Sequence, residues 1–346
     1  MKQFFMVLSI ILFLSIPVCA VEYTAPHAPK DVEDLMPVDT ESFGEGLWKI
    51  IKNASADLRP ALLDAAKVCI GIVAVTMGIA ILKQIPGADA SVCGFAGTVA
   101  IAVLLLSSAN AMVSLGADTV KQLSEYGKLL LPVMTAAMAA GGAITSSTAI
   151  YAGTAAFDAI LSAAISGILV PAVYVILILS IAASATGQEL LKKLRDLIKN
   201  TAGWALRTIL YIFTGYISIT GVVSGTADAA ALKATKLTMA GMVPMVGGIL
   251  SDASEAVLVG AGVVKSAAGV YGLLAVTAIW ISPFIQIGVQ YLLLKLTAAV
   301  CEVFELKAVT ELVGSFSSAM GILLAMTGSV CIMLLVSTVC FMRGVA

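Results

Sequence analysis

The chain alternates between long uncharged apolar stretches and short polar segments. Uncharged intervals recur along most of its length, at residues 68–82, 90–117, 208–227, 266–294 and 312–342. The longest interval runs from 129 to 188 and contains a single charged residue, Asp158. Because a membrane-spanning helix needs about 20 mostly apolar residues, the pattern predicts an all-α fold: a polytopic transmembrane helical bundle with about six to nine spans.

Helix-breaking residues subdivide two of these regions. Within 129–188 the breaks predict two or three helices, and they lie at Pro132, Gly141–Gly142, Gly153 and Pro171. The segment 237–251 is short for a span and is interrupted by Gly241, Pro244 and Gly247–Gly248. It fits either a re-entrant segment buried in protein or a plain loop between two short helices.

Two polar segments between the apolar intervals have the pattern of interfacial amphipathic helices. Residues 189–199 (ELLKKLRDLIK) place leucines on one face, with Lys192, Lys193, Arg195 and Lys199 largely on the other. This is the densest basic cluster in the chain, so the positive-inside rule predicts a cytoplasmic location for it. Residues 295–311 form a similar but acidic segment, which does not indicate a side.

The N-terminal region has the pattern of a signal peptide followed by a polar tail. Lys2 precedes an apolar stretch at 4–16, and small residues end the segment at Ala20. An uncleaved anchor helix is the alternative. We therefore expect a signal peptide at 1–20, an extracytoplasmic tail with an amphipathic segment at 21–56, and a transmembrane domain at 57–346.

Composition agrees with the membrane assignment and argues against nucleic-acid binding. Hydrophobic residues make up 60% of the chain, charged residues 12%, and the mean hydropathy is +1.04. A soluble chain carries roughly 25% charged residues. The net charge of −1 gives no basis for nucleic-acid binding. The six cysteines form no CxxC pair and fit small buried hydrophobes.

Motifs for catalysis are missing from the sequence. The single histidine, His27, lies in the polar tail, and no HExxH or GxxxxGK[ST] motif occurs. We therefore expect neither an enzyme nor a bound cofactor or metal.

Proline spacing suggests an internal duplication. Pro132 and Pro244 are 112 residues apart (244 − 132), and so are Pro171 and Pro283 (283 − 171). This offset would map 115–227 onto 228–340, as in transporters built from repeats. Chance recurrence of proline in apolar sequence is the alternative.

Ionisable residues in or near apolar segments are the candidate functional residues, because each is costly to bury unless it faces protein, a partner or water. Asp158 fits either a pathway position or a helix N-terminus near the interface. Asp252, Glu255 and Lys265 follow the interrupted segment and fit either a water-exposed or partner-facing surface, or headgroup water at helix ends.

Small residues are abundant in stretches such as GTAAFDAILSAAISG and VLVGAGVVKSAAG. Small residues let helix backbones approach closely within lipid. The pattern predicts a tightly packed bundle, with a homo-oligomer as one option for the assembly.

Three stretches carry a resemblance to a known family. They are GVVSGTADAAALKATKLTMAGMVPMVGGILSDASEAVLVGAGVVKSAAGVYGLLA at 221–275, IWISPFIQIGVQYLLLKLTAAVCEVF at 279–304 and FSSAMGILLAMTGSVCIMLL at 316–335. The chain from about residue 56 onward resembles the stage III sporulation protein AE family of endospore-forming bacteria.

The resemblance implies a role in spore formation. Members belong to a complex made in the mother cell and placed in the outer forespore membrane, with ring-forming and ATPase-like components from the same operon. With the forespore protein Q, that complex looks like a secretion apparatus or feeding channel. The resemblance implies that this chain is its permease-like membrane core. The alternatives are a free-standing transporter for a small solute, and a structural anchor without a conduit.

Overall fold

A computed structural model describes residues 26–29, 43–56, 58–85, 90–242 and 247–343. The description leaves out the side chains of some helical residues, namely 43, 56, 59, 90, 91, 221–265 and 343. Most of the predicted signal peptide and polar tail, 1–25 and 30–42, also lies outside it.

Helices account for nearly all of the described residues, and no strand occurs among them, which confirms the all-α prediction. The elements are α3 (Phe43–Ala56), α4 (Leu58–Leu82), α5 (Ala90–Ala140), α6 (Ile144–Ala164), the π-helix η1 (Ile165–Leu169), α7 (Val170–Thr186), α8 (Glu189–Met242), α9 (Gly247–Val303) and α10 (Lys307–Arg343).

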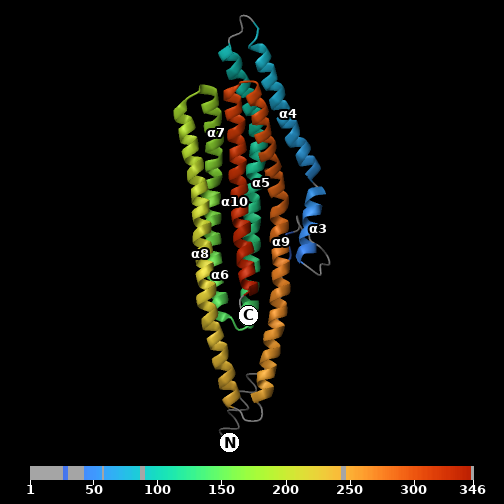
Figure 1. Ribbon diagram of the computed structural model, residues 1–346, viewed down its shortest axis with the longest axis vertical. Coiled ribbons are helices and arrows are strands. Elements are labelled where there is room, and N and C mark those ends of the chain that lie inside the picture. Colours follow the sequence, from blue (N-terminus) through green and yellow to red (C-terminus); the bar gives the residue numbers. More distant parts are fainter. Residues whose placement is uncertain (1–25, 30–42, 57, 86–89, 243–246, 344–346) are drawn as a thin grey trace.

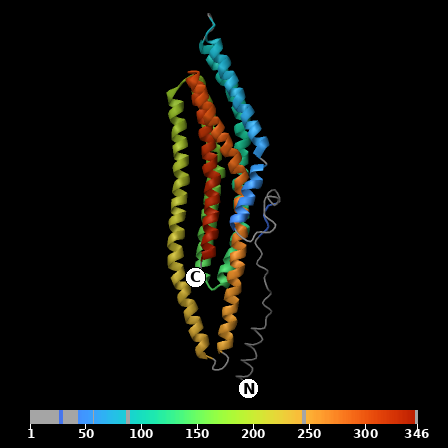
Figure 2. The ribbon, with the colours of Figure 1, turned by 45° about the vertical axis from the view of Figure 1, so that its right-hand side comes forward.

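The long helices stand side by side in an elongated antiparallel bundle (Figures 1 and 2). Helix α10 lies at the centre and packs against α5, α6, α7, α8 and α9. Helices α6, η1 and α7 follow one continuous path up one side, while α3 and α4 flank α9 on the other. The C-terminal end of α8 and the N-terminal end of α9 extend beyond the other helices.

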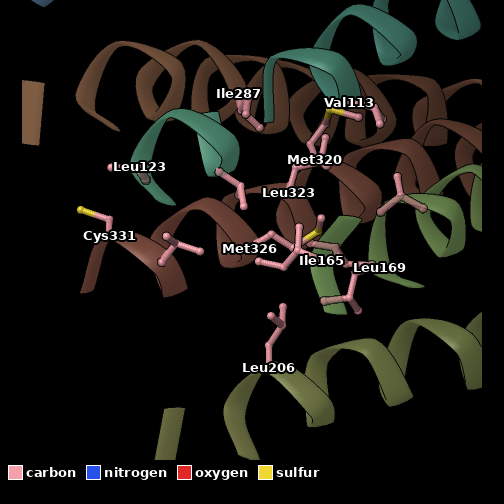
Figure 3. Packing of buried hydrophobic residues seen from close by; sticks show 14 of the residues in the cluster. Val113, Leu123, Ile165, Leu169, Leu206, Ile287, Met320, Leu323, Met326 and Cys331 are labelled. Atoms are coloured by element: carbon pink, nitrogen blue, oxygen red, sulfur yellow. The ribbon is translucent and has the colours of Figure 1, made fainter. Parts of the chain in front are cut away.

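The core follows one face of α10. Phe316, Met320 and Leu323 are fully buried at helical spacing, and Met326 continues the same face. Figure 3 shows Met320, Leu323 and Met326 beside Ile165, Leu169 and Leu206 from neighbouring helices. Because lipid is as apolar as these side chains, close packing of the helices provides most of the stabilisation within a membrane.

Five helical stretches among the described residues are long and apolar enough to cross a membrane: Pro60–Leu82, Val92–Ala140, Ile144–Thr186, Ser266–Val303 and Lys307–Met342. This number is below the six to nine predicted. The stretch Ile144–Thr186 has 43 residues, which as a helix is about 65 Å long, roughly twice the hydrocarbon core of a bilayer.

Only one of the predicted breaks within 129–188 separates two helices. The chain turns at Gly141–Gly142, where Gly142 has a φ of 92°, a conformation that glycine adopts readily. Pro132 lies inside α5, and Gly153 lies inside α6. Pro171 follows η1 at the start of α7, so the helix there continues through a π-turn.

The two predicted interfacial helices are not separate elements. Residues 189–199 form the first turns of α8, which continues without interruption to Met242. Residues 295–311 contain the end of α9, a turn in which Glu305 has a φ of 56°, and the start of α10.

The duplication stays a prediction. Of the pair Pro171 and Pro283, Pro171 lies at the start of α7 and Pro283 lies inside α9. Of the pair Pro132 and Pro244, Pro132 lies inside α5. Pro244 falls outside the described residues.

The outer surface of the bundle is strongly apolar. Ile70, Val103, Ile178, Ile219 and Leu292 each expose more than 60% of their surface. Exposed apolar patches of this extent mark interfaces with a membrane or a partner. Together with the five candidate spans, this surface identifies a membrane protein.

Candidate functional site

Asp158 is a buried carboxylate inside the bundle. It lies on α6, and only 4% of its surface is exposed. The Ser124 hydroxyl of α5 donates a hydrogen bond of 2.6 Å to its Oδ2. Its Oδ1 is buried and has no hydrogen-bond partner among the described residues. Asp158 is therefore a helix–helix contact and not a residue at a helix start.

Polar contacts continue along the same face of α6. Thr154 lies one turn before Asp158, and its Oγ1 is 2.9 Å from the Ser337 Oγ of α10. Nearer the start of α6, the Tyr216 hydroxyl of α8 donates to the Ala149 carbonyl at 2.9 Å. Polar groups of α6 thus contact α5, α8 and α10, with Thr154 and Asp158 on one face of the helix and the Ala149 carbonyl on another side.

Close packing of α6 against α8 depends on Gly153. A Cβ atom at this position would overlap the ring of Tyr216. Phe157, one turn further along, packs edge-on against Phe213 with 5.5 Å between ring centroids. The small residue therefore lets the two helices approach at the level of the polar contacts.

The unpartnered Oδ1 of Asp158 determines what this site can bind. An ionised carboxylate with an unsatisfied oxygen is expensive in an apolar interior, whereas a protonated or cation-bound one is not. Asp158 can therefore hold a proton, a cation or a hydrogen-bond donor at Oδ1. No group of three or more His, Cys, Asp or Glu side chains that would hold a metal occurs in the described part of the chain.

The predicted basic cluster lies at the start of α8, and most of it faces α10. Lys192 is 2.9 Å from both Glu189 and Glu311. Arg195 donates from Nη1 to the Ser315 hydroxyl at 2.8 Å, and Lys199 donates to the Ser318 hydroxyl at 3.2 Å. Lys193 is exposed. The hydrogen bonds from Lys192 to Glu311 and Glu189 raise the pKa of its ammonium group.

Three predicted site residues remain untested. The side chains of Asp252, Glu255 and Lys265 lie outside the described residues, although their backbone belongs to α9. Helix α8 ends at Met242 and α9 begins at Gly247. The re-entrant segment and the loop both stay predictions, because residues 243–246 lie outside the described residues.

The sequence singled out Asp158 but not its neighbours. Thr154 could have been found, because a spacing of four residues places it on the same helix face. Ser124 and Ser337 could not, because they come from helices whose packing the hydrophobic pattern does not define.

Comparison with known proteins places the chain in a family. A model of the family described as stage III sporulation protein AE matches residues 34–344. The chain belongs to the stage III sporulation protein AE family. This confirms the resemblance and, with it, a sporulation role.

A curated member is similar over part of its length. The stage III sporulation protein AE of Bacillus subtilis (strain 168) is 24% identical over 200 residues, which is 58% of this chain and 50% of that protein. The chain thus spans about half the length of this relative in the match. No solved structure matches the chain.

Proposed function

We propose that this stage III sporulation protein AE family member is the polytopic membrane core of a sporulation-specific secretion or channel complex. The complex would link the mother cell to the forespore and be needed for forespore development. The chain would lie in the mother-cell membrane around the forespore, the outer forespore membrane.

The observation that carries this proposal is Asp158 of α6, the one charged side chain among the buried residues of the described part of the bundle. A structural anchor needs only packed apolar helices, and a buried carboxylate with an unpartnered oxygen adds cost without adding packing. Ionisable residues inside membrane bundles mark ion, proton or substrate paths. Asp158 therefore supports a conduit or a switching element in preference to an anchor.

The partners in this proposal are the other membrane and ring-forming proteins of the stage III sporulation A operon, and indirectly the forespore protein Q. The apolar outer surface of the bundle gives room for such membrane partners or for a second copy, as well as for lipid.

A free-standing secondary transporter is the second candidate function. Asp158 favours it, because carboxylates in transporter bundles bind the coupling proton or cation. In that case the chain would work without the complex. The two functions differ in whether the chain is active as a single component.

A substitution at Asp158 tests the proposed function. Asp158→Asn preserves the shape and removes the charge, so in sporulating cells we expect normal protein level and membrane insertion but failed forespore development. Asp118→Asn is the matched control, because Asp118 is an exposed carboxylate on α5. Normal spore yield with Asp158→Asn would contradict the proposal.

A further inference from the structure

Helix α5 has one continuous exposed face along much of its length. The helix packs against α4, α6, α7, α9 and α10, and its remaining face points outward. Residues on that face recur at alternating spacings of four and three, and each of them is exposed: Ser107, Ala111, Ser114, Asp118, Lys121, Glu125, Lys128 and Pro132. This is the heptad spacing that keeps one side of a helix in line with a parallel partner helix.

Three charged residues occupy the second half of this face. Lys121, Glu125 and Lys128 are exposed, and none of them forms an ion pair with a side chain that the structure describes. Asp118, one turn earlier, accepts a hydrogen bond from the Ser114 hydroxyl of its own helix at 3.4 Å. Two positive charges and one negative charge on the face are therefore available to a group outside the chain.

The three charges lie beside the uncharged interior of α10. A Cβ atom at Gly116 of α5 would meet Leu323, and a Cβ atom at Gly127 would meet Leu334. These contacts place the charged half of the α5 face level with the inner part of the uncharged interval 312–342.

Helices α6 and α9 give the same depth. Ser124 of α5 bonds to Asp158, which is the single charged residue between 129 and 188. Leu130 lies beside Gly272 in the uncharged interval 266–294. A charged side chain at this depth is costly when it faces lipid. The exposed face of α5 therefore requires protein or water against it.

The charge pattern of the face suits a second copy of the same chain. Copies of one membrane protein insert in the same orientation, so two copies can meet about an axis along the membrane normal, and each contact then occurs twice. Lys121 and Glu125 are one turn apart, about 6 Å along the helix. The flexible lysine side chain can span that offset. Glu125 of each copy would then lie between Lys121 and Lys128 of the other.

We propose that the exposed face of α5 is the contact between two parallel copies of this chain, with Glu125 of each copy paired with Lys121 of the other. Ser107, Ala111 and Ser114 let the two helices approach closely in the first half of the face. The ion pairs remove the charges from lipid and set the register of the two helices. The inference concerns the chain alone, so it holds for either candidate function.

Disulfide crosslinking of the full-length chain in membranes tests this contact. With the native cysteines replaced, Ser114→Cys places a thiol on the proposed contact, and Ser218→Cys places a thiol at an exposed serine of α8. An oxidant is added to the membranes, and the crosslinked dimer is measured on a non-reducing gel. We expect a strong dimer band from Ser114→Cys and only the background of random collisions from Ser218→Cys.

Charge reversal tests whether the ion pairs form between copies. In the Ser114→Cys chain, Lys121→Glu and Glu125→Lys should each lower the dimer yield at least about tenfold, because each brings like charges together across the contact. Coexpression of the two variants should restore the yield, since one variant then presents acidic residues where the other presents basic ones. Restoration also shows that both variants fold. Lys193→Glu is the matched control, because Lys193 is an exposed lysine on α8, and it should leave the yield unchanged.

Four outcomes would overturn the proposal. One is a dimer yield from Ser114→Cys no higher than from Ser218→Cys. Another is labelling of Ser114→Cys by a water-soluble thiol reagent with no dimer, which would identify a water-lined face of a single chain. A third is a dimer yield that both charge reversals leave unchanged, or that falls equally with Lys193→Glu. The last is a yield that stays low on coexpression, which would show that the charges do not pair between copies.

Discussion

The Ser124 hydroxyl on α5 donates a hydrogen bond of 2.6 Å to the carboxylate of Asp158 on α6, although the two residues are 34 positions apart. Both side chains are buried. This bond joins two antiparallel helices through an ionisable group, and it leaves the second carboxylate oxygen without a partner among the described residues. The same contact therefore contributes to the stability of the bundle and contains the residue that supports its proposed function.

Removal of the Ser124 hydroxyl should destabilise the bundle. Ser124→Ala removes the hydroxyl that donates to the buried Asp158 carboxylate, which should lower the free energy of unfolding by about 1–3 kcal/mol. Thermal unfolding in detergent measures the loss. Ser166→Ala is the control, because Ser166 is exposed and its hydroxyl donates to the Ser162 carbonyl one turn earlier, with no other partner in the described part of the chain. Equal midpoints for the two variants would show that the Asp158 contact contributes nothing.

A side chain at Gly153 should force α6 away from α8. Gly153→Ala places a methyl group into the Tyr216 ring, and overpacking of this kind costs about 1–3 kcal/mol. Gly203→Ala on α8 is matched to it, since a Cβ there meets nothing within 4 Å. It should be neutral or stabilising by up to about 1 kcal/mol, because alanine favours a helix over glycine. Unfolding midpoints in the opposite order would mean that the helices are not in close contact here.

The Lys192 ion pairs should give stability that depends on pH. The hydrogen bonds to Glu311 and Glu189 raise the pKa of Lys192 above 10.5 in the folded chain. A raised pKa means that the contribution is fully present below the unfolded pKa and is lost as the pH rises through the folded value. The difference in unfolding midpoint between the wild type and Lys192→Met should therefore be constant near neutral pH and shrink above about pH 10.4. A difference that stays constant through that range would contradict the ion pairing.

The basic cluster at the start of α8 predicts the orientation of the bundle in the membrane. With the native cysteines replaced, a thiol reagent should label Lys193→Cys from the cytoplasmic side and Asp39→Cys from the opposite side. Lys193 suits this purpose because it is exposed and is not part of the α8–α10 contacts. Labelling of both positions from the cytoplasmic side would reverse the predicted topology of the tail.

The fold class could be predicted from the sequence, whereas the number and ends of the helices could not. Uncharged intervals locate apolar helices by composition, but they do not tell where a long helix stops. The stretch Ile144–Thr186 shows this. Pro171 suggested a break, yet the helix continues through η1, because a π-turn accommodates the proline without separating two elements.

The candidate site could be predicted only in part. Asp158 was evident because a single charge in a long apolar interval is costly. Its contacts with Ser124, and those of Thr154 with Ser337, depend on which helices are neighbours. Residues 189–199 were predicted to form a separate interfacial helix with leucines on one face and basic residues largely on the other. They are instead the start of the long helix α8. Leu190 and Leu197 are exposed, while Arg195 and Lys199 contact α10, because the neighbouring helix cannot be read from the pattern of a single segment.

The most direct test of the central claim is purification of the tagged chain from sporulating cells in mild detergent, with the mass of the assembly measured and its components identified. We predict a large assembly containing the ring-forming and ATPase-like proteins of the same operon. The Asp158→Asn variant should be recovered in the same assembly, since that residue lies inside the bundle. A monomer or homo-oligomer without those partners would contradict the account and favour a free-standing transporter.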